Sequence, residues 1–413
     1  MDKNLLRAVL RSIKGVPIAV TYWDGDTEVF GAVKHEEPRI RVIVKEKLNL
    51  KEMLRDPEIK FSEAYLDQKI DVEGGLKELF SLLIKNEALF KRDLDKEGLF
   101  QRFMKTKKEQ SPLEQATNLQ YHYNLDSDFY RLWLDRTMSF SCAYFQTPED
   151  TLEQAQLQKI DHILGKLQLK EGETLLDIGS GWGWLIIKAA RDYGVNALGI
   201  TLSKEEEEET KRRIKQEGLE DKVQVRVADY RDLCVEGYTF DKVVSVGMFK
   251  YVGKDYIPAY FSCLKKMLKP QGLSLVHSIT RTTESPTSPL LEKYIFPWGH
   301  IPSLREIIWI MSEQQFHLID LESLRLHYAV TTGHWAENFE KVAEEVKEKY
   351  GERFVRIWRL YLVGCTALFH NSGLDIHQLL FSKGLCNDLP LTRDYLYSES
   401  SSPVFRYPAL HSN

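Results

Sequence analysis

Strands and helices alternate regularly in the sequence from Thr174 onward. The stretches TLLDIGSG, VNALGITLS, KVQVRVADY, FDKVVSVGM and LSLVHSIT have the composition of strands, and helical segments such as WGWLIIKAARDYG lie between them. Such alternation is typical of a mostly parallel sheet with helices on both faces. We therefore expect an α/β fold whose ligand site lies at the carboxyl ends of the strands.

The segments on either side of this region follow other patterns. Residues 1–115 predict a smaller α+β domain, with an amphipathic helix, a strand pair joined at Asp24-Gly25, further helices, and a basic linker at Lys105, Lys107 and Lys108. Residues 116–392 form the predicted catalytic domain, which shows two long helical patterns after about residue 304 and then the strand HQLLFSKG. We expect a loosely held tail at residues 393–413.

The composition excludes several classes of protein. The net charge is −5 with 28% charged residues, whereas nucleic-acid binders are usually strongly basic, so no nucleic-acid partner is expected. The N-terminus lacks the apolar core of a secretory signal, and no window reaches the ~18 apolar residues of a spanning helix. Five scattered cysteines without a CxxC pair predict reduced thiols in the cytoplasm and no metal site.

The stretch LLDIGSGWG predicts a cofactor site. It places Gly179 and Gly181 at the end of the first strand of the alternating region, and Gly183 opens the next helix. Glycine lets the backbone approach a ligand closely, and the helix N-terminus offers free N–H groups. A dinucleotide fingerprint would read GxGxxG. The GSGWG turn preceded by Asp177 is closer to the nucleoside-and-amino-acid pocket of S-adenosylmethionine enzymes, although a glycine turn without a ligand is the alternative.

The next two strands also end in residues that suit this cofactor. One ends at Thr201, Leu202 and Ser203, and the following one ends at Asp229 and Tyr230. The Asp229 carboxylate can accept the exocyclic amine of adenine, and the Tyr230 ring can stack on the base. Three strand ends with suitable groups favour S-adenosylmethionine.

Long ordered stretches of the chain resemble the cyclopropane fatty acid synthases, a family that includes the cyclopropane-fatty-acyl-phospholipid synthases and the mycolic acid cyclopropane synthases. The resemblance implies a Rossmann-like S-adenosylmethionine-dependent methyltransferase fold, with further cofactor contacts from Phe140, Ser141, Trp182 and Glu206. The stretches that carry it are YHYNLDSDFYRLWLDRTMSFSCAYF (121–145), LLDIGSGWGW, GITLS, DYRDL, SVGMFKYVG, LVHSIT, YIFPWGHIPS, RIWRLYLVGCTALF and LLFSKG.

The same resemblance implies the chemistry. Family members transfer a methyl group from S-adenosylmethionine to a cis double bond of a phospholipid acyl chain, and a bicarbonate ion then removes a proton so that the ring closes. By motif, the bicarbonate pocket would use Cys142, His277, the Ile279 amide and Tyr328. Cys365 occupies a second cysteine position considered catalytic in the family, and a buried helix residue is the alternative reading.

The sequence departs from the family at the glutamate of this pocket. The family reads GMFEHVG, but this chain reads GMFKYVG, which places Lys250 at the glutamate and Tyr251 at the next residue. Two softer departures are Ser180 in place of a cysteine and Glu206 in place of a glutamine.

A lysine at position 250 could affect the site in four ways. At about 5 Å and an effective dielectric near 20, a free ammonium would oppose a developing carbocation by roughly 3 kcal/mol, about a hundredfold in rate. Lys250 could instead hold the bicarbonate as an ion pair. It could also lose its proton on burial and act as the base, or extend out of the pocket to solvent.

The substrate implied by the resemblance requires contact with a membrane. The first helix carries Lys3, Arg7, Arg11 and Lys14 at three- and four-residue spacing, beside apolar residues. Such a helix can lie on an anionic membrane, or it can dock on its own domain. We expect a cytoplasmic enzyme at the inner face of the membrane, and the resemblance implies a homodimer. The rival functions are a methyltransferase with a methyl-branched or methylene lipid product, a lipid-binding pseudoenzyme, and a methyltransferase of a soluble small molecule.

Overall fold

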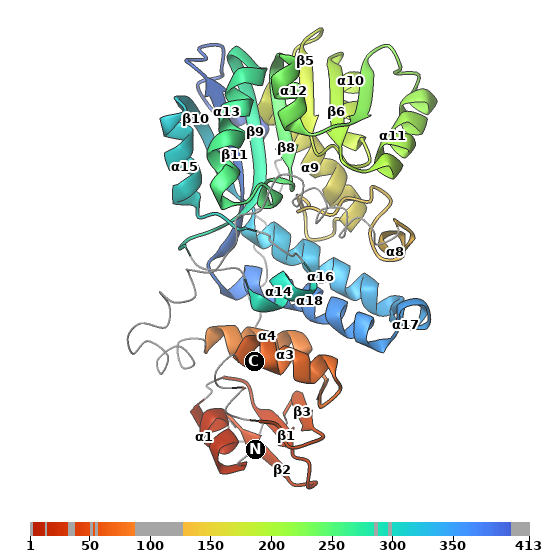
Figure 1. Cartoon of the computed structure of the whole chain (residues 1–413), viewed down its shortest axis with the longest axis vertical. Coiled ribbons are helices and arrows are strands. Elements are labelled where there is room, and N and C mark those ends of the chain that lie inside the picture. Colours follow the sequence, from red (N-terminus) through yellow and green to blue (C-terminus); the bar gives the residue numbers. More distant parts are fainter. Residues whose placement is uncertain are drawn as a thin grey trace.

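The structure is a computed structural model, and it describes residues 3–12, 15–31, 38–49, 53, 57–86, 127–284, 288–295 and 300–397. Figure 1 shows three tiers: a sheet covered by helices, a pair of long helices below it, and a smaller domain at the far end. The expected basic linker and most of the expected tail lie outside the described residues.

The larger sheet has the strand order β10-β11-β9-β8-β5-β6-β7. Neighbours from β9 to β7 pair in parallel, while β11 and β10 add antiparallel strands at one edge. The five strands expected after Thr174 and the late strand HQLLFSKG are confirmed. The strands are β5 (Thr174–Ile178), β6 (Asn196–Thr201), β7 (Val223–Val227), β8 (Phe240–Val246), β9 (Leu268–Arg281), β10 (Phe316–Ser323) and β11 (Leu374–Lys383).

Helices cover both faces of this sheet. Leu175 and Leu176 of β5 are both fully buried, and they enter two different apolar clusters because successive side chains of a strand point to opposite faces. One cluster contains residues of α9 (Leu152–Leu167), α10 (Trp184–Tyr193) and α11 (Lys204–Glu217). The other contains residues of α12 (Tyr230–Glu236), α13 (Ile257–Met267) and α15 (Leu304–Glu313).

The expectation for residues 304–384 is wrong in one respect, because strand β10 lies between the helices. The chain forms α15, then β10, then α16 (Arg325–Lys341), α17 (Ala343–Tyr350) and α18 (Glu352–Asn371) before β11. β10 is an edge strand, and its pairing with β11 shifts between Leu318 and Asp320. The shift interrupts the two-residue periodicity by which a strand is recognised.

The N-terminal domain holds a sheet with the order β2-β1-β3-β4. The expected hairpin at Asp24-Gly25 is confirmed, whereas β3 and β4 were not predicted. The elements of this domain are α1 (Lys3–Ser12), β1 (Ile18–Thr21), β2 (Thr27–Phe30), β3 (Ile40–Val44), α3 (Pro57–Leu66), β4 (Ile70–Glu73) and α4 (Leu76–Lys85). Two further short helices, α8 (Ser127–Arg131) and α14 (Pro289–Tyr294), lie outside this domain.

Helix α18 joins this domain to the remainder of the molecule, since α3 and α4 pack against it (Figure 1). Leu360 packs against Tyr65 and Leu66. The buried Arg356 guanidinium donates to the Tyr65 carbonyl at 2.9 Å and to Asp71 at 3.2 Å. A continuous apolar and polar interface therefore fixes the smaller domain on α18.

Helix α1 docks on the hairpin of its own domain. The Lys3 ammonium pairs with Asp24 at 2.8 Å and with Asp26 at 2.6 Å, and Arg7 pairs with Glu28. These contacts favour the docked alternative for the basic helix. In the part of the chain that the structure describes, no helix is long and apolar enough to cross a membrane.

Candidate active site

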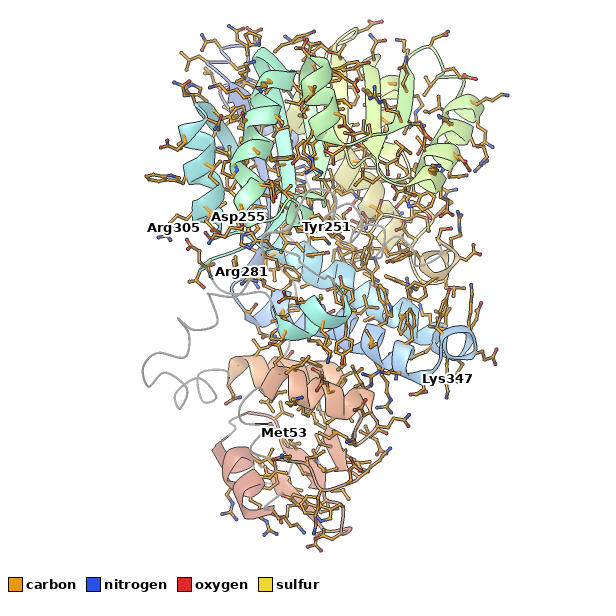
Figure 2. The ribbon with its side chains drawn as sticks, in the orientation of Figure 1. Met53, Tyr251, Asp255, Arg281, Arg305 and Lys347 are labelled. Atoms are coloured by element: carbon orange, nitrogen blue, oxygen red, sulfur yellow. The ribbon has the colours of Figure 1, made fainter. Side chains whose placement is uncertain are left out.

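A cavity of about 260 Å³ lies at the carboxyl ends of four parallel strands. Gly179 after β5, Thr201 at the end of β6, Ala228 after β7 and Gly247 after β8 all line it. After β5 the chain adds β6 and β7 on one side of it and then β8 and β9 on the other. Open sheets bind ligands where the strand order reverses in this way. Figure 2 shows Tyr251, another lining residue, between the lower end of the sheet and α16.

Every residue expected to bind the cofactor lines this one cavity. The residues come from the segment before α9 and from the ends of β5, β6 and β7. Their role in binding stays a prediction, but the fold brings them together: Phe140, Ser141, Asp177, Gly179, Gly181, Trp182, Thr201, Leu202, Ser203, Glu206, Asp229 and Tyr230.

The glycine turn passes very close to α11. Gly183 has φ = 80°, and a Cβ atom added there would lie 2.3 Å from the Thr210 Cγ2 atom. Both the left-handed backbone and the close approach therefore require glycine at this position. The Thr210 hydroxyl donates to the Gly181 carbonyl at 3.3 Å, which fixes the turn against the helix.

Two buried carboxyl groups face the cavity. Burial raises the pKa of Asp177 to about 7, although the Lys159 ammonium acts in the opposite direction. The Asp177 Oδ1 atom has no hydrogen-bond partner among the described residues, as expected of a group placed to receive a ligand. Burial also raises the pKa of Glu206 to about 7, while a hydrogen bond from the Thr201 hydroxyl favours the charged form.

The Asp229 carboxylate and the Tyr230 ring are already held in place by the protein. Asp229 caps α12 and accepts from the Arg231 side chain at 2.8 and 2.6 Å. The Tyr230 ring lies edge-on to Tyr260 at 5.2 Å and is 8% exposed. An adenine amine would therefore share Asp229 with Arg231.

The Lys250 side chain is buried in the cavity wall. It is 9% exposed, and its Nζ atom lies 5.0 Å from the centre of the Tyr251 ring and 5.9 Å from that of Phe140. The possibility that Lys250 extends to solvent is therefore wrong. Burial lowers the pKa of Lys250 to about 8, and the Cys365 thiol acts weakly in the opposite direction. The side chain is thus mostly an ammonium at pH 7.

The other expected catalytic residues do not line the cavity. Cys142 and Tyr328 are buried in an apolar cluster, and Ile279 and Cys365 pack against that cluster. The Cys142 thiol faces the Leu324 carbonyl at 3.8 Å, one helical turn before Tyr328. We call Cys142, His277, Ile279 and Tyr328 the anion group.

His277 is fully buried on β9, beside the cavity strand β8. The Gln378 amide nitrogen lies 3.2 Å from His277 Nδ1 and donates to it, which places the proton of the neutral ring on Nε2. Nε2 has no partner among the described residues. Burial lowers the pKa of His277 to about 3 and raises the pKa values of Cys142 and Tyr328, so all three are neutral at pH 7.

Two known protein families match this chain. The family described as mycolic acid cyclopropane synthetase matches residues 110–379. The chain belongs to the mycolic acid cyclopropane synthetase family. It is an S-adenosylmethionine-dependent methyltransferase of the cyclopropane synthase type. A second family, described only as a domain of unknown function (DUF7884), matches residues 5–95.

The relatives of this family member differ in how much of the chain they match. A probable fatty acid methyltransferase of Pseudomonas putida is 37% identical over 92% of this chain and 96% of its own. A cyclopropane-fatty-acyl-phospholipid synthase of Escherichia coli K12 is 39% identical over 66% of this chain and 69% of its own. The crystal structure of mycolic acid cyclopropane synthase CmaA1 with SAH and CTAB is 32% identical with a TM-score of 0.61, covering 65% of this chain and 98% of that one.

One charged residue that lines the cavity was not predicted from the sequence. Lys159 of α9 lines the cavity and is 4% exposed. A signal was present, because Lys159 lies seven residues after Leu152 and four after Ala155, on the stripe of α9 that faces the core. A lysine on an apolar stripe is a candidate for a buried role.

Proposed function

We propose that this protein is a cyclopropane-fatty-acyl-phospholipid synthase that binds S-adenosylmethionine in the cavity at the ends of β5 to β8. The observation that carries the proposal is the convergence of all the expected cofactor residues on that cavity. Its lining residues Phe140 and Trp182 pack against the apolar cluster that contains Cys142 and Tyr328 of the anion group. The bound cofactor supplies an electrophilic methyl group. The cis double bond of a phospholipid acyl chain attacks this methyl group, and the sulfonium leaves as S-adenosylhomocysteine. A base then removes a proton from the resulting cation, and the ring closes.

The surroundings of the cavity suit an acyl chain. Phe140 lines the cavity and packs against Trp335 at 5.0 Å and Tyr130 at 5.5 Å between ring centres. Aromatic rings of this kind can stabilise a carbocation through their negative faces. The name of the E. coli relative and the SAH in the CmaA1 structure support the same substrate class and cofactor.

The anion group fits a bicarbonate ion. Its neutral His277 offers an Nε2–H donor that is buried and lacks a partner among the described residues. The buried Lys250 ammonium interacts electrostatically with Cys365, as does Tyr328 of the anion group, and it would supply the positive charge that an anion needs in a buried site. We propose that Lys250 holds the bicarbonate as an ion pair, so that the glutamate expected at this position is not required.

A second candidate product is favoured by the same lysine. Without a bound anion, the ammonium would oppose the cation and change which proton is lost. The product would then be a methyl-branched or methylene lipid, in line with the name of the P. putida relative, a probable fatty acid methyltransferase. A lipid-binding pseudoenzyme would bind the cofactor without turnover.

We also propose that the protein works at the inner face of the membrane, because the double bond of its substrate lies within a bilayer, and that it forms a homodimer, as the resemblance to the family implies. Lys3 and Arg7 of α1 form ion pairs with carboxylates of the same domain. Among the described basic residues of α1, the exposed Arg11 is therefore the one that could contact an anionic lipid head group. Cosedimentation with anionic and zwitterionic liposomes tests membrane contact, and sedimentation velocity tests the dimer.

Product analysis tests the proposed function. Purified protein is incubated with S-adenosylmethionine carrying a deuterated methyl group and with liposomes of cis-monounsaturated phospholipid. We expect fatty acids with one added carbon, no double bond and two retained deuterons, because ring closure removes one. Three retained deuterons would indicate a branched chain and contradict the cyclopropane proposal.

A further inference from the structure

Lys159 makes two hydrogen bonds at the edge of the cavity. Its Nζ atom donates to the Ser141 hydroxyl at 3.1 Å and to the Gln156 side-chain oxygen at 2.9 Å. Lys159 and Gln156 are three residues apart and therefore share a face of α9. Both are buried, at 4% and 0% exposure.

Gln156 completes the attachment of the segment before α9. Its amide nitrogen donates to the Ser141 carbonyl at 2.9 Å and to the Ser139 carbonyl at 3.3 Å. The two side chains thus fix a segment that places Phe140 and Ser141 in the cavity and Cys142 in the anion group.

Lys159 also brings a positive charge to a cavity that holds a carboxyl group, Asp177, with an unsatisfied oxygen. Asp177 and Asp135 are the carboxylates that act on it electrostatically. The burial of Lys159 lowers its pKa to about 8, so the ammonium form dominates at pH 7. Asp177 is 3% exposed, lines the same cavity, and leaves Oδ1 without a partner among the described residues.

Two interacting groups of opposite charge that line one cavity complement a zwitterion. The amino-acid part of S-adenosylmethionine carries an α-carboxylate and an α-ammonium group, and buried charges are stable only when they are paired. We propose that Lys159 binds the α-carboxylate of the cofactor while Asp177 receives the α-ammonium, and that Lys159 at the same time positions Ser141. The inference rests on the cofactor site of the proposed function but not on its cyclopropane product.

Two ligands separate recognition of the amino acid from general support of the fold. S-adenosylhomocysteine has both charged groups of the amino acid, and 5′-methylthioadenosine has neither. Calorimetry would give the Kd of each ligand for the full-length wild type, Lys159→Met and Lys159→Gln. Lys242→Met is the matched control, because Lys242 is a buried lysine (7% exposed) paired with Glu173 outside the cavity lining.

We expect both Lys159 variants to bind S-adenosylhomocysteine about tenfold more weakly or worse, since a charge-assisted hydrogen bond is lost. Their affinity for 5′-methylthioadenosine should stay within about twofold, and Lys242→Met should leave the ratio of the two Kd values unchanged. Equal losses for both ligands, or no loss for either, would overturn the inference. A wild type that binds neither ligand would overturn the cofactor assignment itself, whereas tight binding without a cyclopropane product would overturn only the proposed function.

Discussion

The cofactor cavity and the anion group are built by the chain in different ways. The cavity is formed mainly by strand ends between Asp177 and Lys250, where each strand is followed directly by residues that line it. The anion group combines a segment before α9, the strand β9 and the helix α16. A local strand–turn–helix pattern is sufficient to position the residues of the cavity. The position of the anion group depends on how elements that are distant in the sequence pack together.

This difference means that the two regions can fail separately. Cofactor binding should survive changes in the anion group, and the stability of the glycine turn should not depend on that group. Lys250 connects the regions, because it follows β8, lines the cavity and acts electrostatically on Cys365.

The largest effect is expected from His277→Asn. Loss of the buried Nε2–H donor should lower kcat at least about a hundredfold, as when a donor to a buried anion is removed, while the Kd for S-adenosylhomocysteine changes less than about twofold. Steady-state kinetics and calorimetry measure the two quantities. The control is His377→Asn on β11, whose imidazole bonds Thr280 at 2.7 Å, and it should change kcat less than about threefold. Equal losses of kcat and cofactor affinity in His277→Asn would mean that the regions are not separable.

A large effect on the cavity side is expected from Gly183→Ala. The left-handed backbone costs about 1–2 kcal/mol for alanine, and the overlap with Thr210 adds about 1–3 kcal/mol. Denaturant unfolding should show a loss of unfolding free energy equal to the sum of these two costs. The affinity for S-adenosylhomocysteine should fall as well. Gly237→Ala has the same φ of 80° but nothing within 4 Å, so only the backbone cost should appear. Equal destabilisation of the two variants would contradict the close packing of the turn.

Lys250→Glu tests the residue between the regions. If the ammonium holds the anion, Lys250→Glu restores the residue that the family carries in its bicarbonate pocket and should raise turnover no more than about twofold. The measurement is the initial rate of methyl transfer to liposomes at saturating S-adenosylmethionine. A rise of tenfold or more would show that Lys250 impairs the wild-type reaction.

The pH profile gives a graded effect. The pKa of Lys250 is lowered to about 8, so the ammonium is present below that pH and is lost above it. We expect kcat to fall up to about tenfold per pH unit above pH 8, and Lys250→Arg, which stays charged, to move the fall to higher pH. A kcat that instead increases through pH 8 would indicate that neutral Lys250 is the base.

Much of the cavity could be predicted from the sequence because its residues follow directly after apolar strands. Asp177, Thr201 and Asp229 each end or follow a strand whose pattern is clear, and parallel strands bring their ends together. The edge strand β10 was missed because of its interrupted pairing near Leu318. Lys159 was missed because a lysine in a helix usually lies on the solvated face, and only the packing of α9 shows otherwise.

The anion group shows the limit of sequence reasoning more clearly. Cys142, His277 and Tyr328 were identified by resemblance, since nothing in the local pattern distinguishes them from core residues. The structure buries all three, and it adds the Gln378 partner that orients the His277 ring. That orientation arises from the pairing of β11 with β9, two strands almost a hundred residues apart in the chain.

The central claim is that Lys250 holds the bicarbonate that completes ring closure, and a bicarbonate titration tests it most directly. Cyclopropane formation by the wild type and by Lys250→Met would be followed at pH 7.5 in buffer freed of carbon dioxide, with bicarbonate added stepwise. The account predicts a saturable rise in the wild type and a midpoint about tenfold higher in Lys250→Met. The same rate at every bicarbonate concentration in the wild type, or the same midpoint in both proteins, would contradict it.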